Sequence, residues 1–367
     1  MRVIFVQKFI PHYRLPFFEA VKRELESRDI EFHIIHGEAD PFEKSKVKMV
    51  HPDWATKVDS RIMKVAGRYL YWQGAPWRVK RGDLVVAEHA AKLIDNYVLY
   101  FLSRVGFIHF GYFGHGENFQ AASEFWISRV VKKMMLCKVS RWFAYTEVSR
   151  ESLLRQGVDE KLISVVNNTL QKPYSKTPTF KKQPNKFLFI GGLYENKRPD
   201  LIIAAAEIVA LKMARENRPF ELHIVGEGPL VDLVLEAESR CDWLTYHGAL
   251  YGEAKEQMLA SSVAILVPWS VGLVAVDSLH FRCPILTTSK AEHGPEIAYL
   301  EHEKNALIGS VDSSVESFAS LIERFICEPG LSDKLQKACG EDANRYTISA
   351  MADSFIKGVY LVYKSKR

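Results

Sequence analysis

Three short stretches in the second half of the chain carry residue types that suit a diphosphate group. In the first, an apolar run from Phe187 ends at Gly191 and Gly192, and Lys197 and Arg198 stand just before an expected helix. Glycine permits close backbone approach, lysine adds a charge and a helix N-terminus adds partial positive charge. The stretch predicts a diphosphate site, although a plain strand, turn and helix with a solvated Lys-Arg pair explains it equally well.

The second stretch is Val-Gly-Glu-Gly-Pro at 225–229, where Gly226 and Gly228 follow another apolar run. Backbone N–H groups beside these glycines are candidates for contact with the same ligand. A tight turn with proline near a helix start is the alternative, because a lone Gly-x-Gly is a weak signal.

The third stretch joins an apolar run to a helix through a loop at 268–273. The backbone amides of Val271, Gly272 and Leu273 are expected to hold an anion without side-chain help. Asp277 follows by about one helical turn, and its carboxylate can accept the two hydroxyl hydrogen bonds that a ribose offers. An ordinary first-turn acid, favoured by the helix dipole, is the other explanation of Asp277.

In the first half, His115 stands between two glycines after an expected strand, so its ring can lie close to a substrate. A surface-loop histidine without a partner is the alternative. Glu117 lies beside it, Glu88 follows another strand, and Tyr13 and Arg14 follow the first one. We expect these four to contact an acceptor or a phosphate.

The elements that position these residues alternate between short apolar strands and amphipathic helices. Strands are expected at 3–7, 31–36, 83–87, 107–111 and 142–146, and the alternation restarts at 187 and continues to 287. This pattern predicts the α/β class, with parallel sheets covered by helices on both faces. A long helix is expected at 123–135. The segment 40–80 is less regular and is expected to be a loop-rich insertion.

A chain of 367 residues exceeds what one core usually serves. We predict a Rossmann-like domain at 1–170, a linker rich in lysine and proline at 171–185 and a second Rossmann-like domain at 186–345. A final helix at 346–367 is expected to cross back to the first domain. The two doubly wound domains are expected to face a cleft, with ligands at the carboxyl ends of the strands.

The net charge of +5 is distributed unevenly, because residues 1–180 hold 28 lysines and arginines against 19 acids. A basic first half suggests an anionic partner. No nucleic-acid motif is recognisable, so no nucleic-acid partner is expected. Basic and aromatic residues at 123–143 and 69–81 suggest peripheral contact with an anionic membrane, although an ordinary helix with a solvated basic face has the same make-up. The chain has no apolar run of bilayer length, and a cytoplasmic protein is expected.

Taken in order, these stretches resemble the second domain of retaining glycosyltransferases with the two-domain GT-B fold, of the large family 4. The resemblance covers 187–310 well and the first domain only in its layout. Two departures stand out: the arginine of the family's G-R-L is Gly192 here, and the first glutamate of its E-x7-E pair is Trp269, with Asp277 in the second place. The loop at 268–273 fits a variant branch that lacks this first glutamate.

The resemblance implies sugar transfer from a UDP- or GDP-sugar to a saccharide or lipid-linked acceptor in bacterial surface polysaccharide or lipopolysaccharide synthesis. It implies no metal and no cofactor. Catalysis would rest on His115, Lys197 and Asp277. The predicted donor-binding set is Gly191, Gly192, Arg198, Gly226, Gly228, Val271, Gly272 and Leu273. Two alternatives stay open: a nucleotide-sugar epimerase on the same fold, and a non-catalytic glycosyltransferase-like partner protein.

Overall fold

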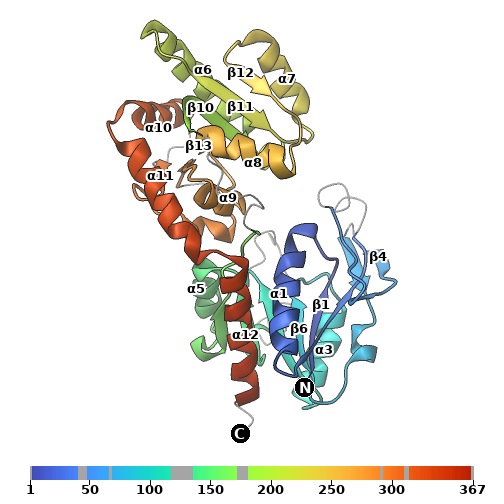
Figure 1. Ribbon diagram of the computed structural model, residues 1–367. Coiled ribbons are helices and arrows are strands. Elements are labelled where there is room, and N and C mark those ends of the chain that lie inside the picture. Colours follow the sequence, from blue (N-terminus) through green and yellow to red (C-terminus); the bar gives the residue numbers. More distant parts are fainter. Residues whose placement is uncertain are drawn as a thin grey trace. The chain divides into compact units, whose positions relative to one another are not determined.

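The computed structural model of the protein describes residues 2–39, 48–65, 68–116, 135–171, 181–289, 292–309 and 314–364. The chain divides into two compact units, each described here by itself. The first comprises 1–171 together with 347–367, and the second comprises 172–346. Each unit contains one parallel β-sheet with helices on its faces (Figure 1), so the predicted α/β class with two doubly wound sheets is confirmed.

The sheet of the first unit has the strand order β3-β2-β1-β6-β7-β8-β9, and all neighbouring strands run parallel. Its strands are β1 (Arg2–Gln7), β2 (Glu31–His36), β3 (Thr56–Lys57), β6 (Leu84–Glu88), β7 (His109–Gly114), β8 (Arg141–Ala144) and β9 (Ile163–Val165). The central strands are buried on both faces, which matches their nearly continuous apolar sequences.

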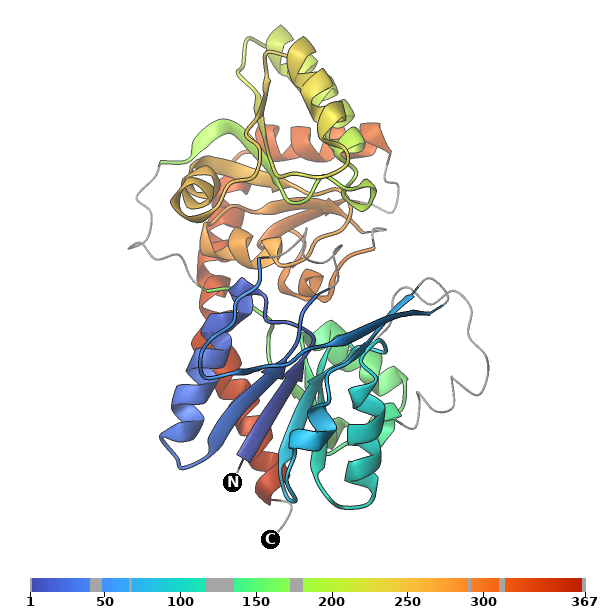
Figure 2. The same ribbon diagram turned by 90° about the vertical axis from the view of Figure 1, so that its right-hand side faces the viewer.

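The segment 40–80 contains more regular structure than its sequence suggested. It holds β3 and an antiparallel hairpin of β4 (Arg61–Val65) and β5 (Arg68–Trp72), followed by the 3-10 helix η2 (Ala75–Arg78). Figure 2 shows this hairpin extending away from the sheet of the first unit. Tyr71 of this hairpin is fully buried, whereas Ile62 and Met63 are 38% and 45% exposed, so apolar side chains lie on its covered and on its exposed parts alike. The apolar alternation that identifies a half-buried strand is therefore absent.

The helices of the first unit are α1 (Leu15–Glu26), α3 (Asp95–Arg104), α5 (Glu147–Arg155) and α12 (Ile348–Lys364), with 3-10 turns η1 (His12–Arg14) and η3 (Glu160–Leu162). The C-terminal helix α12 packs against α1 in this unit (Figure 1). Its Phe355 lies among the rings of Phe5, Phe17 and Phe143 and is fully buried. Burying such a ring stabilises the fold by about 1.5–3 kcal/mol, which fixes the last helix to the first sheet.

The second unit has the strand order β12-β11-β10-β13-β14-β15, again parallel throughout. Its strands are β10 (Gln183–Ile190), β11 (Glu221–Val225), β12 (Leu244–Tyr246), β13 (Ser262–Leu266), β14 (Ile285–Thr288) and β15 (Ala306–Gly309). Its helices are α6 (Pro199–Arg215), α7 (Val231–Arg240), α8 (Gly252–Ser261), α9 (Val274–His280), α10 (Val315–Cys327) and α11 (Leu331–Asp342). Three 3-10 turns complete it: η4 (Glu195–Lys197), η5 (Pro295–Tyr299) and η6 (Ala343–Arg345).

The end of the expected linker belongs to the second sheet, because β10 begins at Gln183 rather than near 187. Pro184 is accommodated there since the pairing with β13 shifts register between Gln183 and Phe187. Proline is tolerated in a sheet at such an irregular strand start, where no ladder hydrogen bond is lost. The segment 172–180 lies outside the described residues.

Candidate functional site

Two loops of the second unit meet backbone to backbone where β10 and β11 end. The N–H of Leu193 donates to the carbonyl of Glu227 at 2.9 Å. A Cβ on Gly226 would lie 1.8 Å from the carbonyl oxygen of Gly191, and one on Gly228 would lie 2.4 Å from that of Leu193. Both glycines also have positive φ, at 146° and 159°. This close approach requires glycine at both positions. The predicted contact of Gly226 and Gly228 with a ligand stays a prediction.

Gly192 occupies the place of the family's arginine, and the ring of Tyr194 lies directly over it. A Cβ on Gly192 would be 2.5 Å from Cε2 of Tyr194. An arginine at this position would force the ring to move. Gly192 and Tyr194 are therefore parts of one local arrangement.

Lys197 links this region to the loop at 268–273. Its Nζ donates a hydrogen bond to the carbonyl oxygen of Ser270, and two ammonium protons remain for other acceptors. Burial lowers the pKa of Lys197, while the nearby carboxylate of Glu296 acts in the opposite direction. The structure thus places one half-buried cation beside the loop that was predicted to hold an anion.

Arg198 follows in the left-handed conformation, with φ 52°, at the start of α6. Its guanidinium pairs with Asp200 at 2.9 Å and lies 6.0 Å from the ring centroid of Trp269. The hydrogen bond to Asp200 raises the pKa of Arg198. The Nε and Nη2 of Arg198 are therefore already occupied by Asp200.

The loop before α9 is held by His293, which sequence reasoning did not identify. His293 accepts the N–H of Val271 on Nδ1 at 3.2 Å, and its Nε2 bonds the carbonyl of Thr288 at 2.8 Å. Burial lowers the pKa of His293, so a neutral ring with the proton on Nε2 fits both contacts. The amide of Val271 therefore already has an acceptor. The N–H groups of Gly272 and Leu273 have none among the described residues, and they remain candidates for an anion.

Asp277 is paired across the unit with a lysine that its sequence context did not reveal. Lys255 in α8 donates from Nζ to Oδ2 of Asp277 at 2.7 Å. The two residues are 22 positions apart, so neither periodicity nor a motif connects them. The pair fixes the carboxylate and leaves its Oδ1 for the predicted ribose contact.

In the first unit, Arg14 and His115 lie on either side of one tyrosine. Arg14 is buried, donates to Oδ1 of Asn168 at 2.5 Å and has its guanidinium 5.3 Å from the ring centroids of Phe113 and Tyr145. The His115 ring lies 4.4 Å from the Tyr145 ring, centroid to centroid. Burial, aided by the Arg14 charge, lowers the pKa of His115 to about 4. The imidazole is therefore neutral at pH 7, and its Nδ1 has no hydrogen-bond partner among the described residues.

The other first-unit residues divide into two groups. The Tyr13 ring centroid lies 5.7 Å from the Arg14 guanidinium, so Tyr13 belongs to the same neighbourhood. Glu88 ends β6 and accepts the N–H of Lys8 at 3.3 Å. Glu117 and most of the expected helix at 123–135 lie outside the described residues.

Within the described ranges there is no cluster of three or more histidine, cysteine, aspartate and glutamate side chains arranged to hold a metal ion. The five cysteines are free thiols. No helix in the same ranges is long and apolar enough to cross a membrane.

Residues 184–328 match the family model described as glycosyl transferases group 1. No curated protein matches. Three solved structures illustrate the likeness. A variant of TarM from S. aureus, in complex with Fondaparinux, alpha-GlcNAc-glycerol and UDP, has 12% identity and a TM-score of 0.65, and the match covers 98% of this chain and 99% of that one.

HepE from Anabaena in complex with UDP has 12% identity and a TM-score of 0.69, with 98% and 100% of the two chains covered. The apo form of WaaB, a lipopolysaccharide outer core galactosyltransferase, has 14% identity and a TM-score of 0.68, with 98% and 99% covered. At such identities the solved structures show the GT-B fold over the whole chain. The family model adds a group 1 glycosyltransferase domain in the second unit.

Proposed function

We propose that the chain is a glycosyltransferase, which moves a sugar from a nucleoside diphosphate sugar to a hydroxyl of a saccharide or lipid-linked acceptor. We further propose that the anomeric configuration is retained and that the product belongs to a bacterial surface polysaccharide or lipopolysaccharide. Support comes from the fold, from the UDP held by the TarM and HepE structures and from the lipopolysaccharide role of WaaB.

The observation that carries the proposal is the position of Lys197. Its ammonium is anchored on the Ser270 carbonyl, in the same loop as the N–H groups of Gly272 and Leu273, which no described residue accepts. As the bond from the sugar to the diphosphate breaks, negative charge develops on the leaving phosphate oxygen. A fixed cation and fixed amide dipoles stabilise that charge without reorganising.

The acceptor, His115 and Asp277 take the remaining roles in the proposed reaction. The acceptor oxygen forms the new glycosidic bond, and its proton passes to the departing diphosphate, so no covalent enzyme intermediate is required. His115, neutral because of its low pKa, serves as a hydrogen-bond partner for a sugar hydroxyl. Asp277, held by Lys255, receives the ribose hydroxyls. In this proposal Lys197 and the amides supply the positive charge, and transfer persists when divalent ions are chelated.

Thermal unfolding in the presence of UDP, GDP, ADP, CMP and TDP tests the donor site. A nucleotide at 100 times its dissociation constant adds about 2.7 kcal/mol of stability, which raises the unfolding midpoint measurably. We expect one diphosphate to give the shift, and Lys197→Ala to abolish it and to lower turnover at least tenfold. Lys212→Ala, an exposed lysine of α6 paired with Glu323, is the matched control. A turnover loss below twofold in Lys197→Ala would remove Lys197 from the mechanism.

One observation favours a second candidate, a non-catalytic relative that partners an active enzyme. Tyr194 lies over Gly192, and Arg198 is paired with Asp200 instead of filling the vacant arginine position. A non-catalytic protein predicts that no nucleotide shifts the unfolding midpoint and that His115→Ala leaves the cell's glycans unchanged. Incubation of donor without acceptor also tests for an epimerase, which would still convert the donor sugar.

We also propose that the first unit contacts an anionic membrane surface. Tyr97 and Phe101 of α3 and Val105, which caps the end of this helix, lie four residues apart and are 40%, 63% and 61% exposed, and Arg104 precedes Val105. Aromatic groups with an adjacent cation suit the interface of an anionic bilayer. Sedimentation with phosphatidylserine vesicles should show binding that Phe101→Ser weakens and Leu361→Ser, an exposed leucine of α12, does not. Equal sedimentation with neutral vesicles would contradict the anionic partner.

A further inference from the structure

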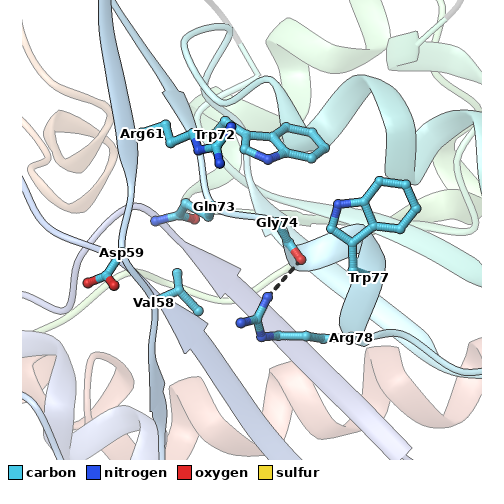
Figure 3. A pocket seen from close by; sticks show the side chains of 8 residues that line it. All are labelled: Val58, Asp59, Arg61, Trp72, Gln73, Gly74, Trp77 and Arg78. Atoms are coloured by element: carbon cyan, nitrogen blue, oxygen red, sulfur yellow. Dashed lines mark hydrogen bonds between the residues drawn. The ribbon is translucent and has the colours of Figure 1, made fainter.

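A pocket of about 370 Å³ in the first unit is lined by residues at the start of β4 and from the end of β5 onward, and it is not part of the arrangement described above. Figure 3 shows two indoles, from Trp72 and Trp77, and two guanidiniums, from Arg61 and Arg78, arranged around Gln73 and Gly74. Its volume falls in the lower range of small-molecule sites. The pocket therefore has the size and the aromatic surface to hold a small ring-shaped ligand.

The position of the pocket in the fold is that of a ligand site. Nε2 of Gln73 donates to the carbonyls of Gln7 and Lys8, at 3.2 and 2.9 Å, where β1 ends. Val58 follows β3 and donates to the carbonyl of His36, the last residue of β2. The pocket thus stands at the carboxyl edge of a parallel sheet, where doubly wound folds bind their ligands.

The loop that forms the floor is held by a buried acid. Asp95 is fully buried, and its two carboxylate oxygens accept the N–H groups of Gln73 and Ala75, each at 2.7 Å. Gly74 between them has φ 63°, and its carbonyl accepts Nη1 of Arg78 at 3.0 Å. These bonds fix the loop at Gln73 and Gly74, which reduces the ordering that binding would require.

The polar groups of the lining point to the charge of the ligand. Arg61 and Arg78 form no ion pair with any residue that the structure describes, and Asp59 is the single carboxylate in the lining. Oε1 of Gln73 is buried, and no described residue donates to it. Arginine binds carboxylate and phosphate groups through paired N–H donors, and indole faces pack against the apolar faces of rings.

We propose that this pocket binds an acidic sugar unit of the acceptor, one that carries a carboxylate or a phosphate. The indoles pack on the sugar ring, and the two guanidiniums receive the anionic group. The proposal rests on the proposed glycosyltransferase function and names the class of its acceptor. It also gives the basic first half of the chain a specific anionic partner.

Calorimetric titration of the full chain with methyl glucuronide, glucose 6-phosphate and methyl glucoside tests this site. We expect at least one acidic sugar to bind tenfold or more tightly than the neutral glucoside, with an affinity that falls as salt screens the charges. Arg61→Gln and Arg78→Gln should each weaken that binding about tenfold. Arg81→Gln removes an equal charge from an exposed neighbouring residue and should change it less than twofold.

The contribution of the indole of Trp77 to sugar binding can be tested separately from that of the arginine charges. Trp77 is 79% exposed, so Trp77→Ala should fold normally while weakening the acidic sugar about tenfold, and Trp77→Phe should recover part of the loss. Preference for the glucuronide identifies a carboxylate acceptor, and preference for the sugar phosphate identifies a phosphorylated one. Equal binding of the neutral glucoside, equal loss in Arg61→Gln and Arg81→Gln, or no binding of any sugar would overturn the proposal.

The nucleotide panel run on the same protein separates the two hypotheses. If a nucleotide shifts the unfolding midpoint and no acidic sugar binds, the acceptor proposal is wrong and the transferase proposal stands. If an acidic sugar binds through Arg61 and Arg78 and no nucleotide shifts the midpoint, the pocket is a saccharide site on a protein without donor binding.

Discussion

The candidate sites of the two units are held together by different groups, backbone in the second unit and side chains in the first. In the second unit the loops after β10 and β11 are held to each other through backbone contacts, such as the bond from Leu193 to Glu227. In the first unit the corresponding neighbourhood consists of side chains, with Arg14 and His115 around Tyr145. Where two backbone segments approach closely, glycine is required at fixed positions, and these glycines form a recognisable pattern in the sequence. Where side chains from distant segments meet, the sequence shows no such pattern.

The strongest test of this difference is Gly226→Ala. The new Cβ would lie 1.8 Å from the Gly191 carbonyl, at a φ that alanine rarely adopts, so the two loops must separate. We expect a loss of about 3 kcal/mol or more in the free energy of unfolding, measured by urea denaturation. Gly272→Ala, where a Cβ meets nothing within 4 Å, should lose less than about 1 kcal/mol. Equal losses would show that the close approach is not what fixes glycine at 226.

The same difference explains how much the sequence could predict. The alternation of strands and helices and the glycine loops of the second unit were accessible, because short apolar runs and glycines report backbone geometry directly. His293, Lys255 and Asn168 were not, since each acts on a residue 22 or more positions away. The sequence shows His293 two residues before Pro295, but this position assigns the histidine no role until the loop that it holds is known.

The protonation of His115 sharpens the contrast, because it depends on burial and on the nearby charge of the Arg14 side chain. Its pKa is about 4 in the folded chain and 6.5 when unperturbed. Between these values the unfolded chain binds the extra proton, so stability is fully present above pH 6.5 and falls as the pH drops toward 4. The difference is worth roughly 2–3 kcal/mol. Urea denaturation from pH 7 to 4 should show this slope, and His115→Gln should reduce it. An unchanged slope in the variant would assign the effect to other groups.

Asn168→Ala tests whether the Arg14 neighbourhood is held by side chains alone. Asn168 is 2% exposed and supplies the oxygen that Nη1 of Arg14 contacts. Its loss leaves a buried cation with one partner fewer, and we expect a destabilisation of about 2 kcal/mol. Asn168→Asp keeps an acceptor and should restore most of it. A loss below about 0.5 kcal/mol in Asn168→Ala would mean that the stacking on Phe113 and Tyr145 suffices.

The smallest effect is expected at one ion pair of the second unit's candidate site. Lys255 and Asp277 are joined at 2.7 Å, with side chains 30% and 15% exposed, so solvent screens the pair in part. A double-mutant cycle with Lys255→Met and Asp277→Asn should give a coupling free energy near 1 kcal/mol. The nucleotide response should separate the two residues further. Asp277→Asn is expected to lose the stabilisation by a nucleoside diphosphate, because the amide replaces one acceptor oxygen. Lys255→Met should keep most of it, since Oδ1 of Asp277 remains. If both variants lose the response equally, the lysine itself contacts the nucleotide, and the site of the second unit depends on side chains as much as that of the first.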